Sequence, residues 1–332
     1  MSTPINATTG NRNGTDRLPQ LGGRTFISEA GFETDLVFNH GIDLPHFATF
    51  PLLESADHRA TFRSYFQSVI DLARRDRTGV VIETATWRAS SDWGALLGYD
   101  ADALDRVNRD SVAFFVELRD ANPDVPVVIS GNLGPRGDGY AIADAMSASE
   151  AAAYHHPQVR SLTDAGADLV SAFTLNYADE ATGIVLAAIR EDVPVVISFT
   201  LETDGRLPSG QTLASAIEEV DAATGGAAAY FMVNCAHPTH FADVLDAPGP
   251  WDRLRGIRAN ASTMSHEELD NATELDRGDE ATLVAGYLAI AERLPHLAVA
   301  GGCCGTDLAH LDQISTAIAA GSTAGRDRRP TV

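Results

Sequence analysis

The stretch Leu297-Ala298-Val299-Ala300-Gly301-Gly302-Cys303-Cys304-Gly305 shows the pattern that decides the fold of this chain. A short, continuous apolar run leads directly into glycine and cysteine, and such a run is typical of a strand buried on both faces of a parallel sheet. A second run, Tyr230-Phe231-Met232-Val233, leads in the same way into Asn234 and Cys235. Chemically reactive side chains therefore follow at least two buried strands directly.

Similar apolar runs occur along the whole chain, and segments with apolar residues at helical spacing separate them. We predict eight strands, at Thr25–Ser28, Val80–Glu83, Val125–Ser130, Leu169–Ala172, Val195–Thr200, Ala229–Val233, Leu254–Ala259 and Leu297–Ala300. We predict helices at Ala56–Ala73, Ala103–Ala121, Ser149–Ala165, Asp179–Arg190, Thr212–Gly225, Glu280–Leu294 and Asp307–Ala320. Strands that alternate with helices favour an α/β fold of the (β/α)8 TIM barrel type.

A doubly wound open sheet is the alternative fold. Such a sheet normally carries a glycine-rich nucleotide-binding turn after its first strand. Here the first predicted strand leads into Ser28-Glu29-Ala30-Gly31-Phe32-Glu33-Thr34, which is not such a turn. We therefore predict a single barrel domain over residues 25–320, with disordered polar tails at residues 1–24 and 321–332.

The composition excludes several classes of protein. The 332 residues carry a formal net charge of −22, and 44% of them are hydrophobic, which is enough for a large core. A surface this acidic repels phosphate backbones, so we expect no nucleic-acid partner; it also suits solubility or adaptation to salt. We see neither an apolar run of about 20 residues, as a membrane helix needs, nor a secretory signal. An odd number of cysteines argues against a disulfide scaffold and favours a cytoplasmic location.

Polar clusters follow the predicted strands, at the end where TIM barrels carry their active sites. These clusters are Glu29, Thr84–Trp87, Gly131–Pro135, Asn176-Tyr177, Thr200–Glu202, Asn234-Cys235, Asn260–Ser262 and Cys303-Cys304. Because the carboxyl ends of all barrel strands meet at one face, we expect Cys235, Cys303 and Cys304 to converge there.

Three thiolates and one open position are typical of a catalytic zinc site, because structural zinc sites normally close with four protein ligands. The adjacent Cys303 and Cys304 would point to opposite faces within a strand. We expect Gly301, Gly302 and Gly305 to supply the positive φ angles that a bend between them needs. Zinc suits thiolate ligands, and a zinc ion this rich in sulfur can hold a further sulfur as a reactive thiolate.

Alternatives remain open from the residues alone. A zinc hydrolase would activate a bound water, although hydrolase sites usually contain histidine or carboxylate ligands. A non-catalytic redox or metal-storage protein would use the Cys303-Cys304 pair, and any single cysteine can be an ordinary buried core residue. We expect His237 and His240 to be loop residues or substrate contacts rather than metal ligands.

The segments Gly301–Thr306 and Val233–Cys235 resemble the zinc-ligand motifs of the homocysteine S-methyltransferase family, zinc-dependent barrels that methylate homocysteine to methionine. Further segments that resemble the family in the same order are Glu29–Gly31, Thr84–Ser90, Gly131–Pro135 and Ser198–Thr200. The likeness implies that Cys235, Cys303 and Cys304 bind Zn²⁺. It implies no catalytic residue beyond the zinc-bound thiolate of the substrate.

The resemblance also implies substrate contacts at the strand ends. The expected substrate-binding residues are Glu29, Thr86, Trp87, Asn176, Glu202 and Asn234. Many relatives carry a glutamate before the threonine of the fourth strand, where this chain has Phe173 and Thr174. We expect Glu202 or Asp204 to replace that acid as the partner of the substrate ammonium group.

The methyl donor is expected to be a small onium compound, because the sequence continues for only about one helix after the last predicted strand. S-methylmethionine and S-adenosylmethionine are both sulfonium ions and fit best, and betaine is a further alternative. Aromatic faces bind onium groups, and Trp87, Trp93, Tyr177 and Phe199 are the candidates. The acceptor could be another thiol or a selenol, and the oligomeric state stays open.

Overall fold

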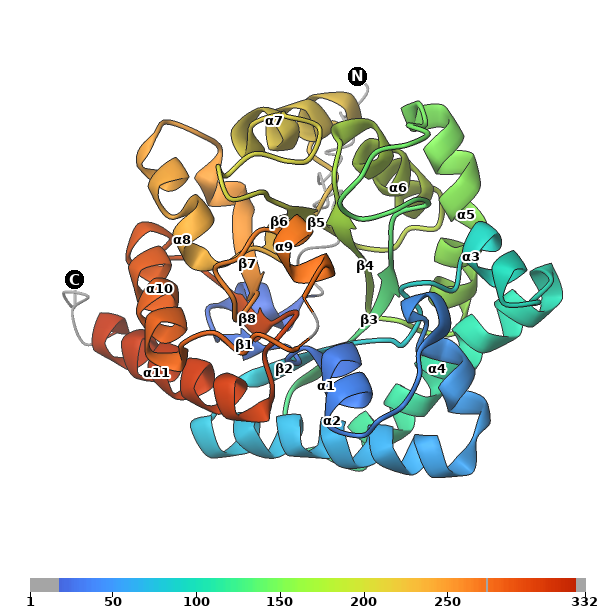
Figure 1. The fold of residues 1–332 in the computed structure, drawn as a ribbon, viewed down its shortest axis with the longest axis horizontal. Helices are drawn as coiled ribbons and strands as arrows, with labels where there is room; N and C mark the ends of the chain where they lie inside the picture. The colour runs from blue at the N-terminus through green and yellow to red at the C-terminus, as the bar shows by residue number, and fades with distance from the viewer. Residues whose placement is uncertain (1–17, 273, 327–332) are drawn as a thin grey trace, which may run out of the picture.

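A computed structural model describes residues 18–272 and 274–326 of the chain. Within these residues, eight parallel strands close into a barrel in the order of the sequence, from β1 to β8, and helices surround them (Figure 1). The first strand closes the barrel, because Phe26 pairs with Gly79 of β2 on one side and with Val299 of β8 on the other. The predicted TIM barrel is confirmed.

The strands are short and almost entirely buried. They are β1 (Phe26–Ile27), β2 (Gly79–Glu83), β3 (Val127–Leu133), β4 (Leu169–Leu175), β5 (Val195–Thr200), β6 (Tyr230–Asn234), β7 (Leu254–Ala259) and β8 (Val299–Gly302). The helices are α1 (Phe32–Phe38), α2 (Ala56–Asp76), α3 (Ser91–Leu96), α4 (Ala101–Asp120), α5 (Ala148–Asp164), α6 (Ala178–Arg190), α7 (Leu213–Thr224), α8 (Pro238–Phe241), α9 (His266–Asp270), α10 (Glu280–Arg293) and α11 (Leu308–Arg326). The 3-10 helices are η2 (Pro19–Gly22), η3 (Pro45–Phe47), η4 (Phe50–Glu54), η5 (Asp243–Asp246) and η6 (Trp251–Arg253).

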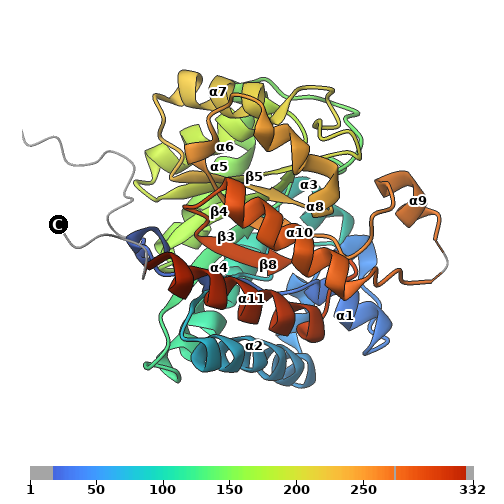
Figure 2. The same cartoon turned by 90° about the vertical axis from the view of Figure 1, so that its left-hand side faces the viewer.

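Every predicted strand and helix overlaps an observed one. The strands β3 and β4 continue beyond their predicted ends, to Leu133 and Leu175, because small and polar residues there still pair with the neighbouring strands. The short helices α1, α3, α8 and α9 were not predicted, since none is long enough to show a helical apolar period. Figure 2 shows that α9 projects beyond the same end of the barrel at which α1 lies.

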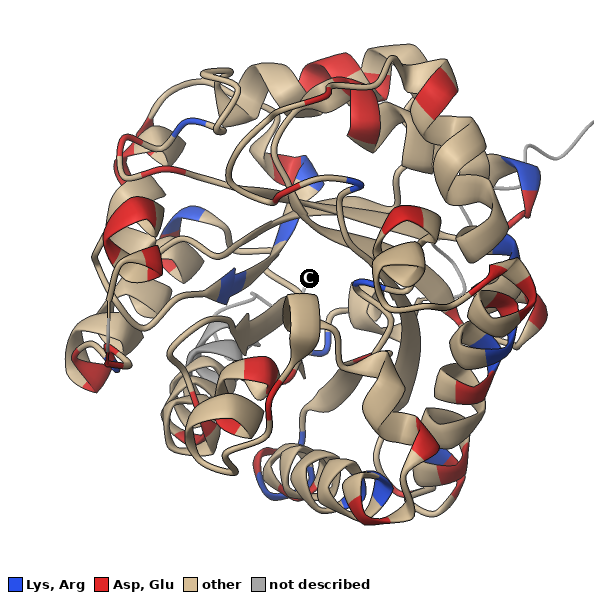
Figure 3. Cartoon of the chain, turned by 45° about the vertical axis from the view of Figure 1, so that its right-hand side comes forward, with Lys and Arg blue, Asp and Glu red and all other residues tan. Residues whose placement is uncertain are grey.

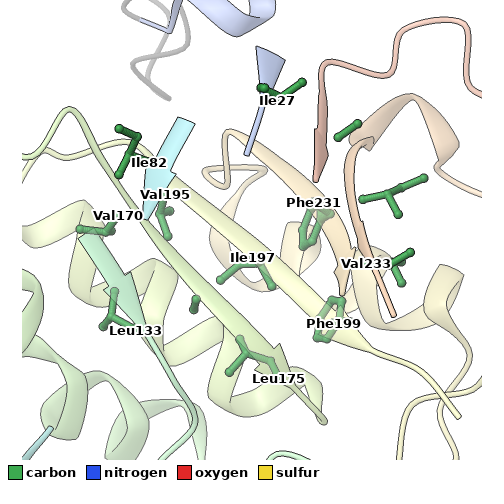
Figure 4. Packing of buried hydrophobic residues seen from close by; sticks show 14 of the residues in the cluster. Ile27, Ile82, Leu133, Val170, Leu175, Val195, Ile197, Phe199, Phe231 and Val233 are labelled. Atoms are coloured by element: carbon green, nitrogen blue, oxygen red, sulfur yellow. The ribbon is translucent and has the colours of Figure 1, made fainter. Parts of the chain in front are cut away.

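The alternation of side chains along each strand divides the core into two parts. Outward-facing strand residues such as Ile82, Val170, Ile197 and Val233 pack against the surrounding helices (Figure 4). A second cluster fills the barrel interior; it includes Phe26, Val81, Val128, Leu169, Tyr230 and Met232. Phe199 belongs to the outer part and is fully buried, so it is not available to bind an onium donor.

Part of the predicted N-terminal tail is structured. Within the predicted tail of residues 1–24, Pro19–Gly22 form a 3-10 helix, and Leu18 and Gln20 are buried. The Gln20 side chain donates a hydrogen bond to the Tyr230 hydroxyl at 3.3 Å, so this segment packs against the barrel interior. The last helix also extends past the predicted boundary at residue 320, to Arg326. Residues 1–17 and 327–332 lie outside the described part of the chain.

Acidic residues are spread over the outer helices and the loops (Figure 3). This distribution leaves the strands and the barrel interior to apolar and a few selected polar residues. None of the helices described here has the length and apolar character that a membrane span requires.

Candidate active site: a three-cysteine cluster

The three cysteines meet at the carboxyl ends of two strands. Cys235 follows β6, whereas Cys303 and Cys304 follow β8, with β7 paired between these two strands. All three Sγ atoms lie within 4.8 Å of one another, and the Sγ atoms of Cys235 and Cys303 are 2.8 Å apart. In the described residues this is the only cluster of three or more potential metal ligands, and neither His237 nor His240 belongs to it. The predicted convergence of the cysteines is confirmed.

A tight turn separates the two adjacent cysteines. The Thr306 amide donates to the Cys303 carbonyl at 3.1 Å, and Gly305 has a φ of 78°. A positive φ at the third residue is the signature of a type II turn. The turn begins directly after β8, so Cys303 and Cys304 are not confined to opposite faces of a strand, and both thiols can approach Cys235.

The two glycines before this turn have a different role from the predicted one. Only Gly305 has a positive φ; Gly301 and Gly302 are ordinary residues of β8, so the expectation of positive φ angles there was wrong. Their importance is steric. A Cβ atom on Gly302 would collide with the Thr306 hydroxyl, and one on Gly301 would lie 2.9 Å from the Glu29 carbonyl oxygen. Glycine thus allows β8 to approach β1 closely.

Asn234 positions Cys235 from within β6. Its Nδ2 atom donates to the Cys235 Sγ atom at 3.2 Å and to the Thr174 hydroxyl at 2.9 Å. Its Oδ1 atom accepts from the Thr174 amide and from the Ser198 hydroxyl. These four bonds use the full capacity of a side-chain amide. Asn234, predicted to bind substrate, orients Cys235 through these bonds.

Each of the three thiols affects the pKa of the others. Hydrogen bonds from Cys303 and Cys304 lower the pKa of Cys235 well below its usual value. The same interaction with Cys235 raises the pKa of Cys304. The cluster alone thus stabilises one thiolate between two thiols. A bound soft cation would allow all three sulfurs to lose their protons.

Tyr140 lies beside the cluster and also contacts α9. Tyr140 comes from the segment between β3 and α5, and its hydroxyl is within hydrogen-bonding reach of Cys235. Its ring stacks on His266 of α9, with centroids 4.0 Å apart. Burial first, and then the nearby Cys235, raise the pKa of Tyr140 well above its usual value, so the hydroxyl keeps its proton. Tyr140 therefore links Cys235 to α9 through its contact with His266.

A charged cluster lies beside the cysteines inside the barrel. Arg258, on β7, pairs with Glu29 at 2.8 Å and donates to the Gly302 carbonyl at 3.1 Å. Its guanidinium also lies over the ring of Phe173, 4.9 Å from the centroid. Glu29 additionally accepts a hydrogen bond from Ser28 at 2.9 Å. Glu29, predicted to contact substrate, is thus already engaged in a buried ion pair.

Two further acids stand near Arg258. Burial raises the pKa of Glu33 to about 7. Burial, and then the charge of Glu29, raise the pKa of Glu83 to about 8. The side chain of Glu83 accepts a hydrogen bond from Ser171, which also contacts Ser130. At neutral pH Glu83 therefore carries a proton, whereas Glu33 is close to half-ionised.

The other predicted substrate contacts differ in their availability. Thr86 is fully buried, and its hydroxyl donates to the Asn132 carbonyl at 2.7 Å. This hydrogen bond connects the segment after β2 to the end of β3. Asn176 donates to the Asp138 carbonyl, and its Oδ1 atom is buried without a hydrogen-bond partner. Glu202 lies in the turn after β5, where its backbone bonds to Arg206 and Gly205. The structure shows no side-chain contact of Glu202 with the cysteine cluster.

The tryptophans nominated for donor binding already hold a cation. The Arg88 guanidinium lies 3.9 Å from the Trp87 ring centroid and 3.8 Å from the Trp93 ring centroid. Burial lowers the pKa of Arg88 to about 10. Trp87 also donates from its indole nitrogen to the Phe173 carbonyl at 3.3 Å. An onium donor can therefore use only the faces of these rings that Arg88 leaves free.

Sequence reasoning missed Arg258, Glu33, Glu83 and Tyr140 as site residues. The signal for Arg258 and Glu83 was present, since each is a buried charged residue near the end of a barrel strand. Glu33 lies only four residues after Glu29 in the segment that follows β1. Tyr140 gave no signal, because it lies in a long loop whose path cannot be derived from a periodic pattern.

The fold and the site together define a class of protein, namely a TIM barrel with a three-cysteine cluster that could hold a metal ion at its mouth. Comparison with protein families is more specific, because the family model of homocysteine S-methyltransferase matches residues 31–318. The chain therefore belongs to the homocysteine S-methyltransferase family. Family membership supports the predicted methyltransferase rather than the hydrolase or the redox protein.

Among solved structures, the chain is similar to the homocysteine methyltransferase MmuM from Escherichia coli. The metallated form is 19% identical, with a TM-score of 0.68 over 90% of this chain and 98% of that chain. The oxidized form is 20% identical, with a TM-score of 0.69 over 91% and 98%. At this level of identity the likeness shows a shared fold. No curated protein matches the chain.

Proposed function

We propose that this chain transfers a methyl group from a small sulfonium donor to the thiolate of homocysteine, giving methionine, at a zinc centre held by Cys235, Cys303 and Cys304. The observation that carries the proposal is the convergence of three sulfur atoms within 4.8 Å at the strand ends where TIM barrels perform their chemistry. Membership in the family supplies the reaction and the acceptor.

The residues present fit a zinc ion. Three soft sulfur donors come from two separate strand ends, and zinc accepts such donors in tetrahedral sites. Cys303 and Cys304 stay partly exposed, whereas Cys235 is buried. Three protein ligands leave one tetrahedral position for the sulfur of a substrate. When bound, zinc would keep that sulfur deprotonated at neutral pH.

The chain itself contributes the positioning of the thiols. Asn234 fixes Cys235, and the turn from Cys303 to Thr306 fixes the other two thiols. The homocysteine sulfur forms a bond to the methyl carbon while the bond from that carbon to the donor sulfonium breaks. The bonding electrons stay with the donor, so no protein group has to transfer a proton.

The charge of the chain suits a cationic donor. With a net charge of −22, the protein attracts sulfonium ions over a long range. S-methylmethionine and S-adenosylmethionine both carry this charge on sulfur. Two of the substrate-binding residues predicted from the sequence remain free to contact the methyl donor or homocysteine. They are Trp87, which is partly exposed after the end of β2, and Asn176, whose Oδ1 atom has no hydrogen-bond partner.

The test is a transfer assay with isotopic label. Zinc-loaded protein is mixed with carbon-13-labelled homocysteine and with unlabelled S-methylmethionine or S-adenosylmethionine, and methionine is followed by mass spectrometry. We expect labelled methionine, and none from protein stripped of metal. Hydrolysis of esters or amides without methyl transfer from any sulfonium donor or betaine would contradict the proposal. Methylation of a different thiol or a selenol in preference to homocysteine would show that homocysteine is not the true acceptor.

A further inference from the structure

Glu33 lies against the cysteine-bearing turn. It belongs to the first turn of α1, which begins next to β1 (Figure 1). The preceding Gly31 donates its amide to the Thr306 carbonyl at 3.2 Å and to the Thr306 hydroxyl at 3.0 Å. A Cβ atom on Gly31 would collide with the Cys303 carbonyl oxygen. The start of α1 is therefore in direct contact with the turn, and Glu33 interacts electrostatically with Cys303 and Arg258.

The charges in this region do not balance. Arg258 is the cation that the acids Glu29, Glu33 and Glu83 share, and it forms its ion pair with Glu29. Glu83 is buried and hydrogen-bonded by Ser171, and it is protonated at neutral pH. In the described part of the chain, Glu33 forms no ion pair. Glu33 is thus left without an ion-pair partner of its own beside the cysteine cluster.

Glu33 also differs from Glu29 and Glu83 in its exposure to solvent. Glu29 and Glu83 are both 5% exposed, so their side chains are closed off from the barrel mouth. Glu33 keeps an intermediate exposure, as do Cys303 and Cys304. Of the three acids, Glu33 is therefore the one that a ligand at the exposed thiols can reach.

A second, independent feature is a buried acceptor without a hydrogen-bond donor in a segment that contacts the cysteine cluster. The Oδ1 atom of Asn260 is buried and has no hydrogen-bond partner among the described residues. The backbone of Asn260 bonds to the Ala236 carbonyl, next to Cys235, and the amide of Ala261 donates to the Cys304 carbonyl. Buried acceptors are nearly always satisfied, so an unsatisfied one beside the cluster points to a ligand that carries donors.

We propose that Glu33 binds the α-ammonium group of the acceptor amino acid while its sulfur lies at the cysteine cluster. This inference rests on the proposed function and specifies how the acceptor is recognised. An ammonium group brings both the missing positive charge and several N–H donors, and a carboxylate that pairs with it forms a charge-assisted hydrogen bond.

The experiment compares two acceptors on two proteins. Homocysteine and 4-sulfanylbutanoate share the thiol and the carboxylate, and only homocysteine carries the ammonium. For zinc-loaded wild type and Glu33→Gln, both kcat/KM and the dissociation constant from calorimetry are measured with each acceptor. We expect Glu33→Gln to weaken homocysteine binding, and to lower kcat/KM for homocysteine, by roughly 10- to 100-fold. The same two quantities for 4-sulfanylbutanoate should change by less than about twofold.

Two variants control for effects on folding and charge. Glu218→Gln makes the same charge change at an exposed position of α7, and we expect it to leave both acceptors unchanged. Glu33→Asp keeps the charge on a shorter side chain, so it should lose less homocysteine affinity than Glu33→Gln. Melting temperatures of all variants report whether the barrel is intact.

The following results would contradict the proposed role of Glu33. Equal losses for both acceptors in Glu33→Gln would show a purely structural role, and unchanged homocysteine binding would show no role. If wild type binds homocysteine but does not methylate it, the proposed function fails, whereas the binding comparison still decides the role of Glu33. If wild type does not bind homocysteine at all, both proposals are wrong.

Discussion

Cys235 has a φ of 53°, and Thr174, which faces it across the strand ends, has a φ of 64°. Left-handed angles are unfavourable for residues with a side chain, most of all for a β-branched threonine, and cost of the order of 1 kcal/mol or more each. Asn234 hydrogen-bonds to both residues and so holds the two strained positions together. The strain lies where a sulfur must point out of the strand direction and toward the other cysteines.

Replacing one sulfur should remove the metal without removing the fold. We expect Cys303→Ser to lower the zinc affinity and to abolish methyl transfer, because zinc prefers sulfur and a serine hydroxyl does not ionise at neutral pH. The barrel should survive, since strand-end chemistry and barrel stability are largely separate. Zinc content, circular dichroism and the transfer assay measure the three effects. Full activity in Cys303→Ser would show that this cysteine is not a ligand.

Glu83 should make stability depend on pH. Its pKa is about 8 in the fold, against about 4.5 in the unfolded chain, so the folded state holds an extra proton between these values. Stability from this group is therefore lost as the pH rises from about 4.5 to about 8. Glu83→Gln cannot ionise, yet it keeps an acceptor for Ser171 beside Glu29 and Arg258.

We expect Glu83→Gln to be more stable than wild type at pH 8.5, by a few kcal/mol, and to approach wild type near pH 5. Urea unfolding at several pH values measures the difference, and the exposed Glu218→Gln serves as the control. A difference that does not change with pH would mean that Glu83 is ionised in the fold at all these values.

At the scale of elements, the end of β8 depends on the absence of side chains. A methyl group on Gly302 would collide with Thr306, whose hydroxyl accepts from Gly31 and donates to the Cys303 carbonyl at 2.6 Å. We expect Gly302→Ala to cost roughly 1–3 kcal/mol of stability, as overpacking does, and to weaken zinc binding because the turn moves.

Gly137→Ala is the matched control for this variant, because a Cβ atom at Gly137 meets nothing within 4 Å. Thermal melting and zinc titration of both variants provide the measurement. Equal melting temperatures and equal zinc affinities of Gly302→Ala and Gly137→Ala would contradict the close packing of β8 against the turn.

The elements with a strong periodic signal could be predicted from the sequence, whereas the details of the site could not. Buried strands such as Val195–Thr200 are continuous apolar runs, and their order along the chain determines the parallel barrel. The cysteines could be placed at one face because every barrel strand ends there. The pairing of Arg258 with Glu29, and the approach of Tyr140 to Cys235, depend on side-chain packing between distant segments, which no local pattern contains.

At the scale of the whole molecule, the net charge of −22 affects binding of the two substrates differently. A sulfonium donor is attracted over a long range, and salt screens that attraction. Homocysteine carries no net charge at neutral pH and experiences little of it. We expect kcat/KM for S-methylmethionine to fall roughly 3- to 10-fold between low and high salt.

The same salt series for homocysteine is the internal control, and its kcat/KM should change little. Steady-state kinetics at fixed pH with increasing sodium chloride provide both values. An equal dependence on salt for donor and acceptor, or none for either, would contradict electrostatic attraction of the donor.

X-ray absorption at the zinc edge tests most directly whether three sulfur atoms of this chain hold one ion and leave one position for the acceptor. Without substrate we predict three sulfur ligands at about 2.3 Å and one lighter ligand; with homocysteine we predict four sulfur ligands. A spectrum dominated by nitrogen and oxygen, or a sulfur number that homocysteine does not raise, would contradict the account.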